Sequence, residues 1–384
     1  MSELWPLPQD PLVAEVRAAV ERGRLAQRYR ELDRAPEFPR AEFRALGEAG
    51  LLGLTVPREL GGRGLPPTRA AILLFHLAYL SGTTFAKLSL QPEFCSVLGE
   101  HGPAELVERW YRPLLRGELL VGNQVTEPSA GSDAAALALE AAPTAGGYVL
   151  TGEKSEAAFA TEAEAAIVYG RRPGSARAEG VSAFLVPQGL DGVRRAVAAP
   201  DLGERWQRRG SITYTQVHLP SDHRLGEEGE GFAYLQAELA RERGLLAAIY
   251  LGVARASWDE TVRHVGERMA FGRRLADQQA VAFPLVEDGA ELEASWGFTV
   301  RALERLEHGE VADADTAMSK VRATRAALTT LEHAIQFHGG AGYSARYPHE
   351  QRWRDVRSGP LGHGATEVLE GVVARRLWPR PPRR

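Results

Sequence analysis

The order in which helical and strand-like patterns follow one another most constrains the fold of this chain. From residue 12 to about 120, apolar side chains recur with helical spacing. From about 120 to 225 the pattern changes to short β-like runs separated by turn-forming residues, and from Gly231 onward helical spacing returns. Strands gathered in one block, without helices between them, exclude a Rossmann-type arrangement and predict a β-domain between two helical regions.

We therefore predict a mostly α-helical protein with a small β-domain, in three parts. The expected parts are an all-α N-terminal domain (1–120), a central β-barrel-like domain (121–228) and a C-terminal four-helix bundle (229–384). The pattern predicts strands that include residues 148–150, 166–169, 182–186 and 212–219. It predicts long helices at 231–266, 279–308, 314–340 and 363–378. No functional cluster is evident in the N-terminal helices.

Composition excludes several classes of function. A net charge of −4 over 384 residues gives no reason to expect nucleic acid or an anionic membrane as a partner. No apolar run reaches the roughly 20 residues that a membrane helix needs. The single cysteine, Cys95, excludes an intrachain disulfide and is expected to be a small buried hydrophobe. With no secretory signal at the N-terminus, we expect a cytoplasmic protein.

A loop-like stretch at residues 125–133 carries the strongest functional signal. Its sequence, VTEPSAGSD, combines a proline, a glycine and three short hydroxyl side chains after an apolar run. Such a loop leaves backbone N–H groups free to bind an anion. The whole string resembles the T-E-P-x-A-G-S-D flavin-binding signature of the acyl-CoA dehydrogenase family. That resemblance implies FAD as the cofactor, with contacts from Val125, Thr126, Gly131 and Ser132.

Two further strings strengthen the resemblance. Residues 268–279 are similar to the family's R-x-x-F-G-x-P-L-x-x-x-Q, with Arg274 in place of the usual proline, and residues 336–343 are similar to its Q-x-x-G-G-x-G-Y. In the family, the Arg and Gln of the first string reach the FAD of a neighbouring subunit. The resemblance therefore implies a homo-oligomer, with a tetramer (a dimer of dimers) as the family norm. It adds FAD contacts from Arg268, Phe271, Gln279, Gln336, Gly339 and Gly340.

The family's most common catalytic carboxylate is replaced in this chain. In most members it lies in an I-Y-E-G-T-S-E string near the C-terminus, and the matching stretch here, residues 361–367, has His363 at that position. Members that resemble isovaleryl-CoA and long-chain dehydrogenases place the base in an L-x-x-E-R string, which residues 239–243 (LARER) match. Glu242 is therefore the first candidate base, against the alternative of a solvated helix acid. His363 is the second, because imidazole titrates near neutral pH.

The same C-terminal stretch implies contacts with substrate and cofactor. A small residue at Gly362, where tyrosine is common, resembles the isovaleryl type and leaves room for a branched acyl chain. The backbone N–H of His363 corresponds to the family's donor to the thioester oxygen, which stabilises the developing enolate together with a ribityl hydroxyl of the flavin. By resemblance, the substrate contacts are Ser132, Arg243 and Gly362. Further FAD contacts are implied for Thr366 and Glu367.

Several flavin contacts of the family are replaced. Glu156 stands where a tryptophan covers the flavin, Ala158 where a threonine lies near N5, and Ala365 where a threonine contacts FAD. These changes predict a flavin that is bound more weakly or in a more open site. No set of residues has the spacing of a metal site.

Three functions are consistent with these residues. The first is a FAD-dependent acyl-CoA dehydrogenase of fatty acid metabolism, acting on a short or branched acyl group carried by CoA or an acyl carrier protein. It would pass electrons to an electron-transfer flavoprotein. The second is a flavin-dependent monooxygenase on the same fold, which the open site and His363 favour. The third is a non-catalytic relative that has kept the scaffold and lost turnover.

Overall fold

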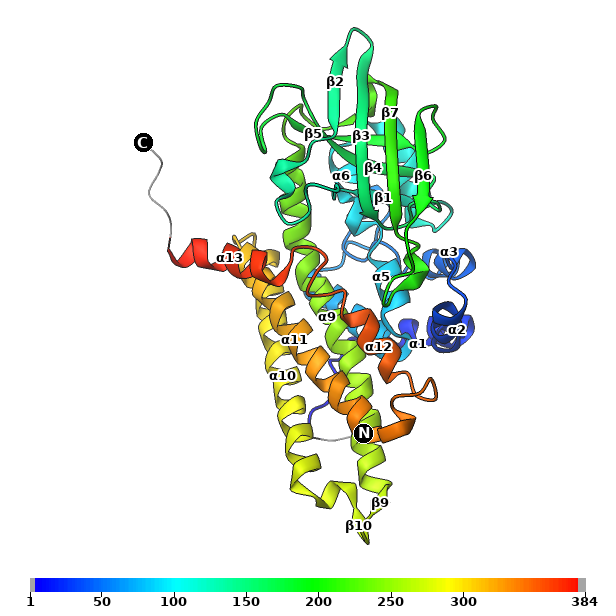
Figure 1. The fold of residues 1–384 in the computed structure, drawn as a ribbon, viewed down its shortest axis with the longest axis vertical. Coiled ribbons are helices and arrows are strands. Elements are labelled where there is room, and N and C mark those ends of the chain that lie inside the picture. Colours follow the sequence, from blue (N-terminus) through cyan, green and yellow to red (C-terminus); the bar gives the residue numbers. More distant parts are fainter. Residues whose placement is uncertain (1–3, 379–384) are drawn as a thin grey trace.

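The computed structural model describes residues 4–378, so the ends of the first and last predicted parts, residues 1–3 and 379–384, lie outside it. As the sequence predicts, helices come first, then a sheet, then long helices (Figure 1). The N-terminal helices are α1 (Val13–Gly23), α2 (Leu25–Arg34), α3 (Arg40–Glu48), α4 (Pro67–Ser81), α5 (Thr83–Ser89) and α6 (Ser96–His101). A last helical segment consists of α7 (Ala104–Leu106), a π-helical turn (Val107–Tyr111) and α8 (Arg112–Leu115).

Helix α4 forms the centre of the N-terminal part. Pro67 lies in its first turn, where the missing N–H costs nothing, and apolar residues occupy nearly all of its sides. Gly82 ends the helix with a φ of 78°. A Cβ at this position would lie 2.6 Å from the ring of Tyr29, so only glycine permits the direct turn from α4 into α5.

The central part is an eight-stranded sheet with the order β6-β7-β3-β2-β4-β5-β8, in which β1 pairs in parallel with β4. The predicted strands correspond to β3 (Gly147–Ala157), β4 (Ala165–Arg171), β5 (Val181–Pro187) and β7 (Gly210–Pro220). The pattern missed β1 (Val121–Gln124), β2 (Glu140–Thr144), β6 (Val193–Val197) and β8 (Arg224–Leu225). Strand β6 is largely exposed and polar, and the others are short, so none has the apolar pattern of a strand.

Strands β4 and β5 are buried on both faces, which explains their continuous apolar sequences. Along β4, Ile167 and Tyr169 face the large core shared with the helices, whereas Ala166 and Val168 face a second core within the sheet. Because successive side chains in a strand point to opposite faces, one short strand contributes to both cores. This arrangement fixes β1, and the loop that follows it, against the helices.

The C-terminal part begins with α9 (Gly231–Glu267), a hairpin of β9 (Met269–Ala270) and β10 (Arg273–Arg274), and α10 (Gln279–Glu307). It continues with α11 (Asp313–His338), a short α12 (His349–Val356) that the sequence did not predict, and α13 (Thr366–Leu377). Helices α9, α10 and α11 run side by side, and α13 crosses the end of the group that is nearer the sheet (Figure 1). The β9–β10 hairpin lies at the opposite end of the molecule from the sheet.

The long helix α9 connects these parts. Small residues line its centre, and a Cβ at Gly252 would lie 2.3 Å from the carbonyl oxygen of Phe75, so α4 crosses α9 in close contact at this point. The end of α9 nearer its N-terminus reaches the sheet and carries Glu238 and Glu242. No helix within residues 4–378 is both long and apolar enough to span a membrane.

A buried polar network holds the three parts together around Asp355 of α12. One carboxylate oxygen of Asp355 accepts hydrogen bonds from the Tyr29 hydroxyl (2.7 Å) and the Thr83 hydroxyl (3.0 Å), both in the N-terminal part. Its other oxygen accepts the backbone N–H of Glu204, which lies beside the sheet, at 2.6 Å. The Glu204 carboxylate in turn forms an ion pair with Lys87 of α5.

Candidate active site

The two candidate bases of the sequence lie next to each other. Glu242 Oε2 is 3.7 Å from His363 Nε2, although the residues are far apart in the chain. The Glu242 side chain is 3% exposed and that of His363 is 31% exposed. The alternative of a solvated helix acid is therefore wrong for Glu242. Both residues therefore belong to a single site, which lies at the junction of α9, α6, β1 and the turn before α13.

The Glu242 carboxylate has an oxygen that is free to accept a proton. Its Oε1 is buried and has no hydrogen-bond partner among the described residues. Burial first, and then the neighbouring Glu238 carboxylate, raise the pKa of Glu242 well above its ordinary value. Because a raised pKa makes the ionised carboxylate a stronger base, this environment is suited to proton abstraction.

Glu238 lies one turn before Glu242 on the same face of α9. Its carboxylate accepts hydrogen bonds from Asn123 Nδ2 (2.9 Å) and from the Ser96 hydroxyl (3.4 Å). Burial raises the pKa of Glu238 to about 8. Two adjacent buried carboxylates with raised pKa values are costly for stability, and such pairs are concentrated at functional sites.

His363 lies in a turn in which cations bind the carbonyl groups of residues 362–364. Lys320 Nζ donates to the carbonyl oxygens of Gly362 and Gly364, the latter at 2.7 Å. Arg243 Nε donates to the carbonyl oxygen of His363 at 3.0 Å. Burial, together with Lys320 and other nearby cations, lowers the pKa of His363 to about 3, so its imidazole is neutral.

Sequence reasoning missed several residues of this site. It found no functional cluster in the N-terminal part, yet the Phe94 ring lies 4.9 Å from the His363 ring and Ser96 contacts Glu238. Neither Asn123 nor Lys320 was predicted as a residue of the site. The spacing of Glu238 and Glu242 was the available signal, because acids four residues apart lie on the same face of a helix.

The loop at residues 125–133 is held from beneath by a buried ion pair. Lys154 Nζ of β3 lies 2.8 Å from Glu127 Oε1 and also donates to the carbonyl oxygen of Val125 at 3.0 Å. The Glu127 carboxylate accepts the backbone N–H groups of Ala138 and Leu139 as well. The glutamate of the T-E-P string therefore shapes the loop from inside rather than facing a ligand.

The outer side of this loop fits a flavin nucleotide. Among the described residues, the backbone N–H groups of Thr126, Ser129, Gly131 and Ser132 have no acceptor. Gly131 and Ser132 are exposed and Thr126 is half-buried. N–H donors and short hydroxyl groups in an exposed loop are the groups that bind polar edges and phosphates of a cofactor.

Of the three replaced flavin contacts, Glu156 is polar and paired, and the other two are alanines. Glu156, in the place of the family's tryptophan, has a φ of 53° and a side chain that is 58% exposed. Its carboxylate lies 3.0 Å from Arg209. Ala158 and Ala365 are half-buried, and each is smaller than the threonine that it replaces. This geometry fits the expectation of a more open flavin site.

The other predicted cofactor residues lie at the far end of the long helices (Figure 1). The His264 ring of α9 stacks on the His338 ring of α11 with centroids 4.1 Å apart, which joins the two predicted strings at this end. Phe271, at the hairpin turn, is 96% exposed. Arg268, Gln279, Gln336, Gly339 and Gly340 are also exposed. The loop at 125–133 and this end of the helices are thus two separate surfaces of one chain.

The remaining predicted residues lie around the start of α13. Gly362 is exposed and Thr366 is half-buried, while Glu367 is exposed. Gly362 belongs to the turn that carries His363 and Arg243 donates to this turn, whereas Ser132 lies in the flavin-type loop. Within residues 4–378, no group of three or more His, Cys, Asp or Glu side chains is arranged to hold a metal ion.

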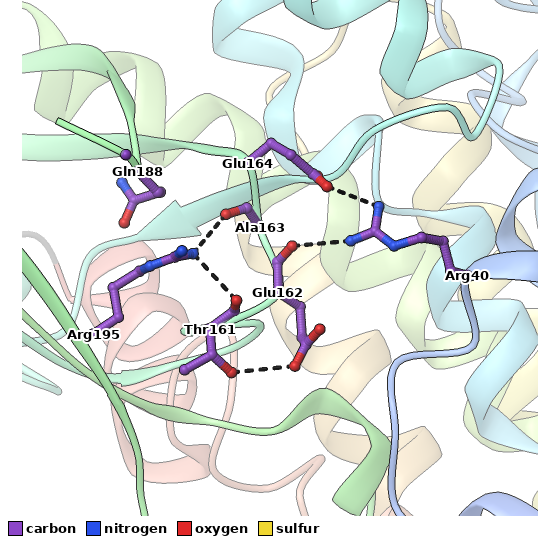
Figure 2. A pocket seen from close by; sticks show the side chains of 8 residues that line it. Arg40, Thr161, Glu162, Ala163, Glu164, Gln188 and Arg195 are labelled. Atoms are coloured by element: carbon purple, nitrogen blue, oxygen red, sulfur yellow. Dashed lines mark hydrogen bonds and ion pairs between the residues drawn. The ribbon is translucent and has the colours of Figure 1, made fainter.

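A surface pocket of about 390 Å³ lies elsewhere, at the edge of the sheet (Figure 2). Arg195 Nη1 donates to the carbonyl oxygens of Thr161 and Ala163 at 3.3 and 2.9 Å, and Arg40 pairs with Glu164 at 2.9 Å. Because its arginines are already engaged, this pocket offers little for a charged ligand. None of its lining residues belongs to the Glu242 site.

Comparison with known proteins shows the family to which the chain belongs. Three family descriptions match successive parts of the chain: "Acyl-CoA dehydrogenase, N-terminal domain" at residues 8–118, "middle domain" at 122–217 and "C-terminal domain" at 229–378. The chain belongs to the acyl-CoA dehydrogenase family. It is accordingly an oxidoreductase that acts on a CH–CH group, and its cofactor is FAD, as the motifs predicted.

Individual members of the acyl-CoA dehydrogenase family match over nearly the whole chain. Benzylmalonyl-CoA dehydrogenase of Aromatoleum aromaticum is 32% identical, over 92% of this chain and 94% of the relative. Subunit CarC of the caffeyl-CoA reductase–Etf complex of Acetobacterium woodii is 29% identical, over 90% and 92%. The structure of butyryl-CoA dehydrogenase from Megasphaera elsdenii superposes with a TM-score of 0.90 at 25% identity, over 97% and 100%.

Proposed function

We propose that this acyl-CoA dehydrogenase oxidises a short or branched acyl thioester, with Glu242 as the base that removes the α-proton. The observation that carries the proposal is the buried Glu242 carboxylate, whose unpartnered oxygen lies beside the turn of His363. The flavin-type loop at 125–133 follows β1, and β1 contributes Asn123 to the same site. A base and a cofactor surface are therefore held by adjoining segments.

The residues of this chain have distinct parts in the proposed reaction. Glu242 accepts the α-proton, and the electrons of the broken C–H bond pass to the thioester carbonyl. The His363 N–H, which has no acceptor among the described residues, donates to the carbonyl oxygen and stabilises its negative charge. When bound, FAD supplies the acceptor for the hydride that leaves the β-carbon.

Electrostatics favours Glu242 over His363 as the base. A proton acceptor works best when its pKa lies near the working pH. The pKa of Glu242 is raised from below that range, whereas the pKa of His363 is lowered to about 3. The His363 imidazole is neutral here, and with so low a pKa it would bind the abstracted α-proton only weakly. We assign His363 the task of presenting its backbone N–H, with its ring packed against Phe94.

The proposed acyl group is short or branched because of the residues around the base. Gly362, next to His363 in the chain, has no side chain, and the rings of Phe94 and His363 lie 4.9 Å apart, so the residues beside the base are one small residue and two rings. The butyryl-CoA dehydrogenase similarity supports a short chain. The similarity to a benzylmalonyl-CoA enzyme supports a branched one.

Anaerobic titration with a panel of acyl-CoAs tests this function. The purified protein is expected to be yellow, and its flavin absorbance should bleach with a short or branched acyl-CoA because two electrons are transferred to the cofactor. Long straight-chain acyl-CoAs serve as the control and should bleach it weakly. A yellow protein that no acyl-CoA bleaches would favour the monooxygenase, which oxygen consumption with reduced flavin would reveal. A protein that refuses added FAD would contradict both enzymes.

We also propose that a complete flavin site needs two chains. The loop at 125–133 and the surface carrying Arg268, Gln336 and Gly339 lie at different places on one molecule (Figure 1). The second surface is exposed, with Phe271 96% and Tyr343 86% accessible. Exposed aromatic side chains beside an arginine are typical of an interface or ligand site.

Light scattering on the FAD-bound protein tests the assembly. We expect the mass of a tetramer, and we expect Arg268→Glu to reduce flavin bound per chain, because the guanidinium would be replaced by a group that repels phosphate. Arg301→Glu, at an exposed site on α10 with no ion pair among the described residues, is the matched control. A monomer that holds one FAD per chain would contradict the two-chain site.

The similarity to a subunit of an Etf-containing complex supports an electron-transfer flavoprotein as the acceptor of the reduced enzyme. The same relative is named as a subunit of a reductase complex.

A further inference from the structure

Lys320 is a buried cation without an acidic partner. It lies on α11, is 1% exposed, and forms no ion pair with a carboxylate among residues 4–378. Burial, with repulsion from Arg243 and Lys87, lowers the pKa of Lys320 to about 7. Such a group is costly for stability, and neither the packing of the helix nor the proposed base explains it.

The hydrogen bonds of Lys320 act on the peptide group that carries the proposed oxyanion donor. Lys320 Nζ donates to the carbonyl oxygen of Gly362, and the N–H of that same peptide unit belongs to His363. Since the N–H and C=O of one peptide polarise each other, a cation on the oxygen makes the N–H a stronger donor. The N–H itself has no acceptor among the described residues.

Lys320 and Arg243 also hold the other two carbonyl groups of residues 362–364. Lys320 also donates to the carbonyl oxygen of Gly364 at 2.7 Å, and Arg243 donates to that of His363 at 3.0 Å. His363 and Gly364 have φ values of 54° and 97°, in the left-handed region that a non-glycine residue seldom adopts. Three carbonyl groups directed at two cations fix the direction of the intervening N–H groups.

We propose that Lys320 is a positioning residue of the reaction, which orients and polarises the His363 N–H for the thioester oxygen through the carbonyl group of Gly362. It never touches the substrate. In its protonated form, Lys320 stabilises, from one peptide unit away, the negative charge of the enolate that forms when Glu242 removes the α-proton. This inference rests on the proposed function, because it requires a thioester at the site.

The test separates enolate formation from hydride transfer. The probe is the acyl-CoA that bleaches the wild-type flavin best, resynthesised with sulfur in place of the β-carbon, so that the α-proton can leave but no hydride can follow. The bound enolate is followed by its long-wavelength charge-transfer absorbance with oxidised flavin. The compared proteins are wild type, Lys320→Met, Lys320→Arg and Thr324→Val. Thr324 is the matched control, because it is buried one turn further along α11.

We expect Lys320→Met to keep its flavin and its affinity for the un-ionised probe, but to show at least about tenfold less enolate at equilibrium and a fall in kcat of roughly 10- to 100-fold. Lys320→Arg should recover most of both, because it keeps the charge and two donors. Thr324→Val should match the wild type. If Lys320→Met does not fold, Lys320→Gln, which keeps a donor without the charge, is expected to show the same loss.

Two results would overturn the inference. Equal enolate fractions in wild type and in a folded uncharged variant would show that Lys320 only anchors the turn. A loss that follows flavin content or probe affinity, with an unchanged enolate fraction in the bound complex, would show the same. Failure of the wild type itself to bleach with any acyl-CoA would remove the proposed function and this inference with it.

Discussion

Glu242→Gln is expected to lower turnover of the best acyl-CoA by roughly 10²- to 10⁴-fold, the contribution of a positioned general base. Glutamine keeps the shape of the side chain but cannot accept the α-proton. Flavin content should stay the same, because Glu242 lies at the junction of α9 with the turn of His363 and not in the loop at 125–133. Stopped-flow measurement of flavin reduction under anaerobic conditions gives the rate of the affected step directly.

The pH profile of the wild type adds a second expectation. Glu242 accepts a proton only when it is ionised, and its pKa is raised by burial and by Glu238. Flavin reduction should therefore increase with pH over a range that lies above the ordinary glutamate value of about 4.3.

Glu238→Gln is the matched control for a buried acid on the same face of α9. It removes a negative charge that raises the pKa of Glu242, so the rise in rate should move to lower pH while the plateau stays within about tenfold of wild type. If Glu242→Gln kept its rate and His363→Asn lost it, the base would be His363 and the present assignment would be wrong.

Glu127→Ala is expected to reduce the free energy of unfolding by about 3–5 kcal/mol, the usual effect of removing one partner of a buried ion pair. The substitution leaves Lys154 in the core without its carboxylate and deprives the N–H groups of Ala138 and Leu139 of their acceptor. Flavin bound per chain should fall as well, because this pair holds the loop in shape. Urea unfolding and the flavin-to-protein absorbance ratio measure the two effects.

Asp133→Asn provides the comparison within the same loop. Asp133 pairs with Arg177 at 2.9 Å, and both side chains are more than half exposed. An exposed pair of this kind contributes about 0–1 kcal/mol, so stability should change little. A Glu127→Ala protein as stable as Asp133→Asn would mean that the buried pair does not hold the loop.

The parts of this structure that could be predicted are those with a local pattern. The helical spacing around α4, α9, α10 and α11, and the apolar runs of β4 and β5, correspond to the observed elements because burial selects those side chains directly. Strand β6 and helix α12 were missed because partner segments, rather than their own sequences, decide their conformation.

The residues of the candidate site can also be divided into those that a local motif reveals and those that only the fold brings together. The string at 125–133 and the acid Glu242 could be found in the sequence, since they belong to continuous motifs. Lys320 could not, because its role depends on two carbonyl groups some 40 residues further along the chain. The nearness of Glu242 and His363 was hidden for the same reason, and the two were treated as competing alternatives until the fold placed them side by side.

The hydrogen-bond network around Asp355 limits which substitutions and domain exchanges the chain can accept during evolution. Its hydrogen bonds join Tyr29 and Thr83 of the first part, Glu204 beside the sheet and α12 of the last part in one buried cluster. A sheet exchanged from a distant relative would arrive without the matching partners and leave buried polar groups unsatisfied. The three parts are therefore expected to be inherited as one block, with substitutions of Tyr29, Thr83 and Asp355 occurring together, and those of Glu204 together with Lys87.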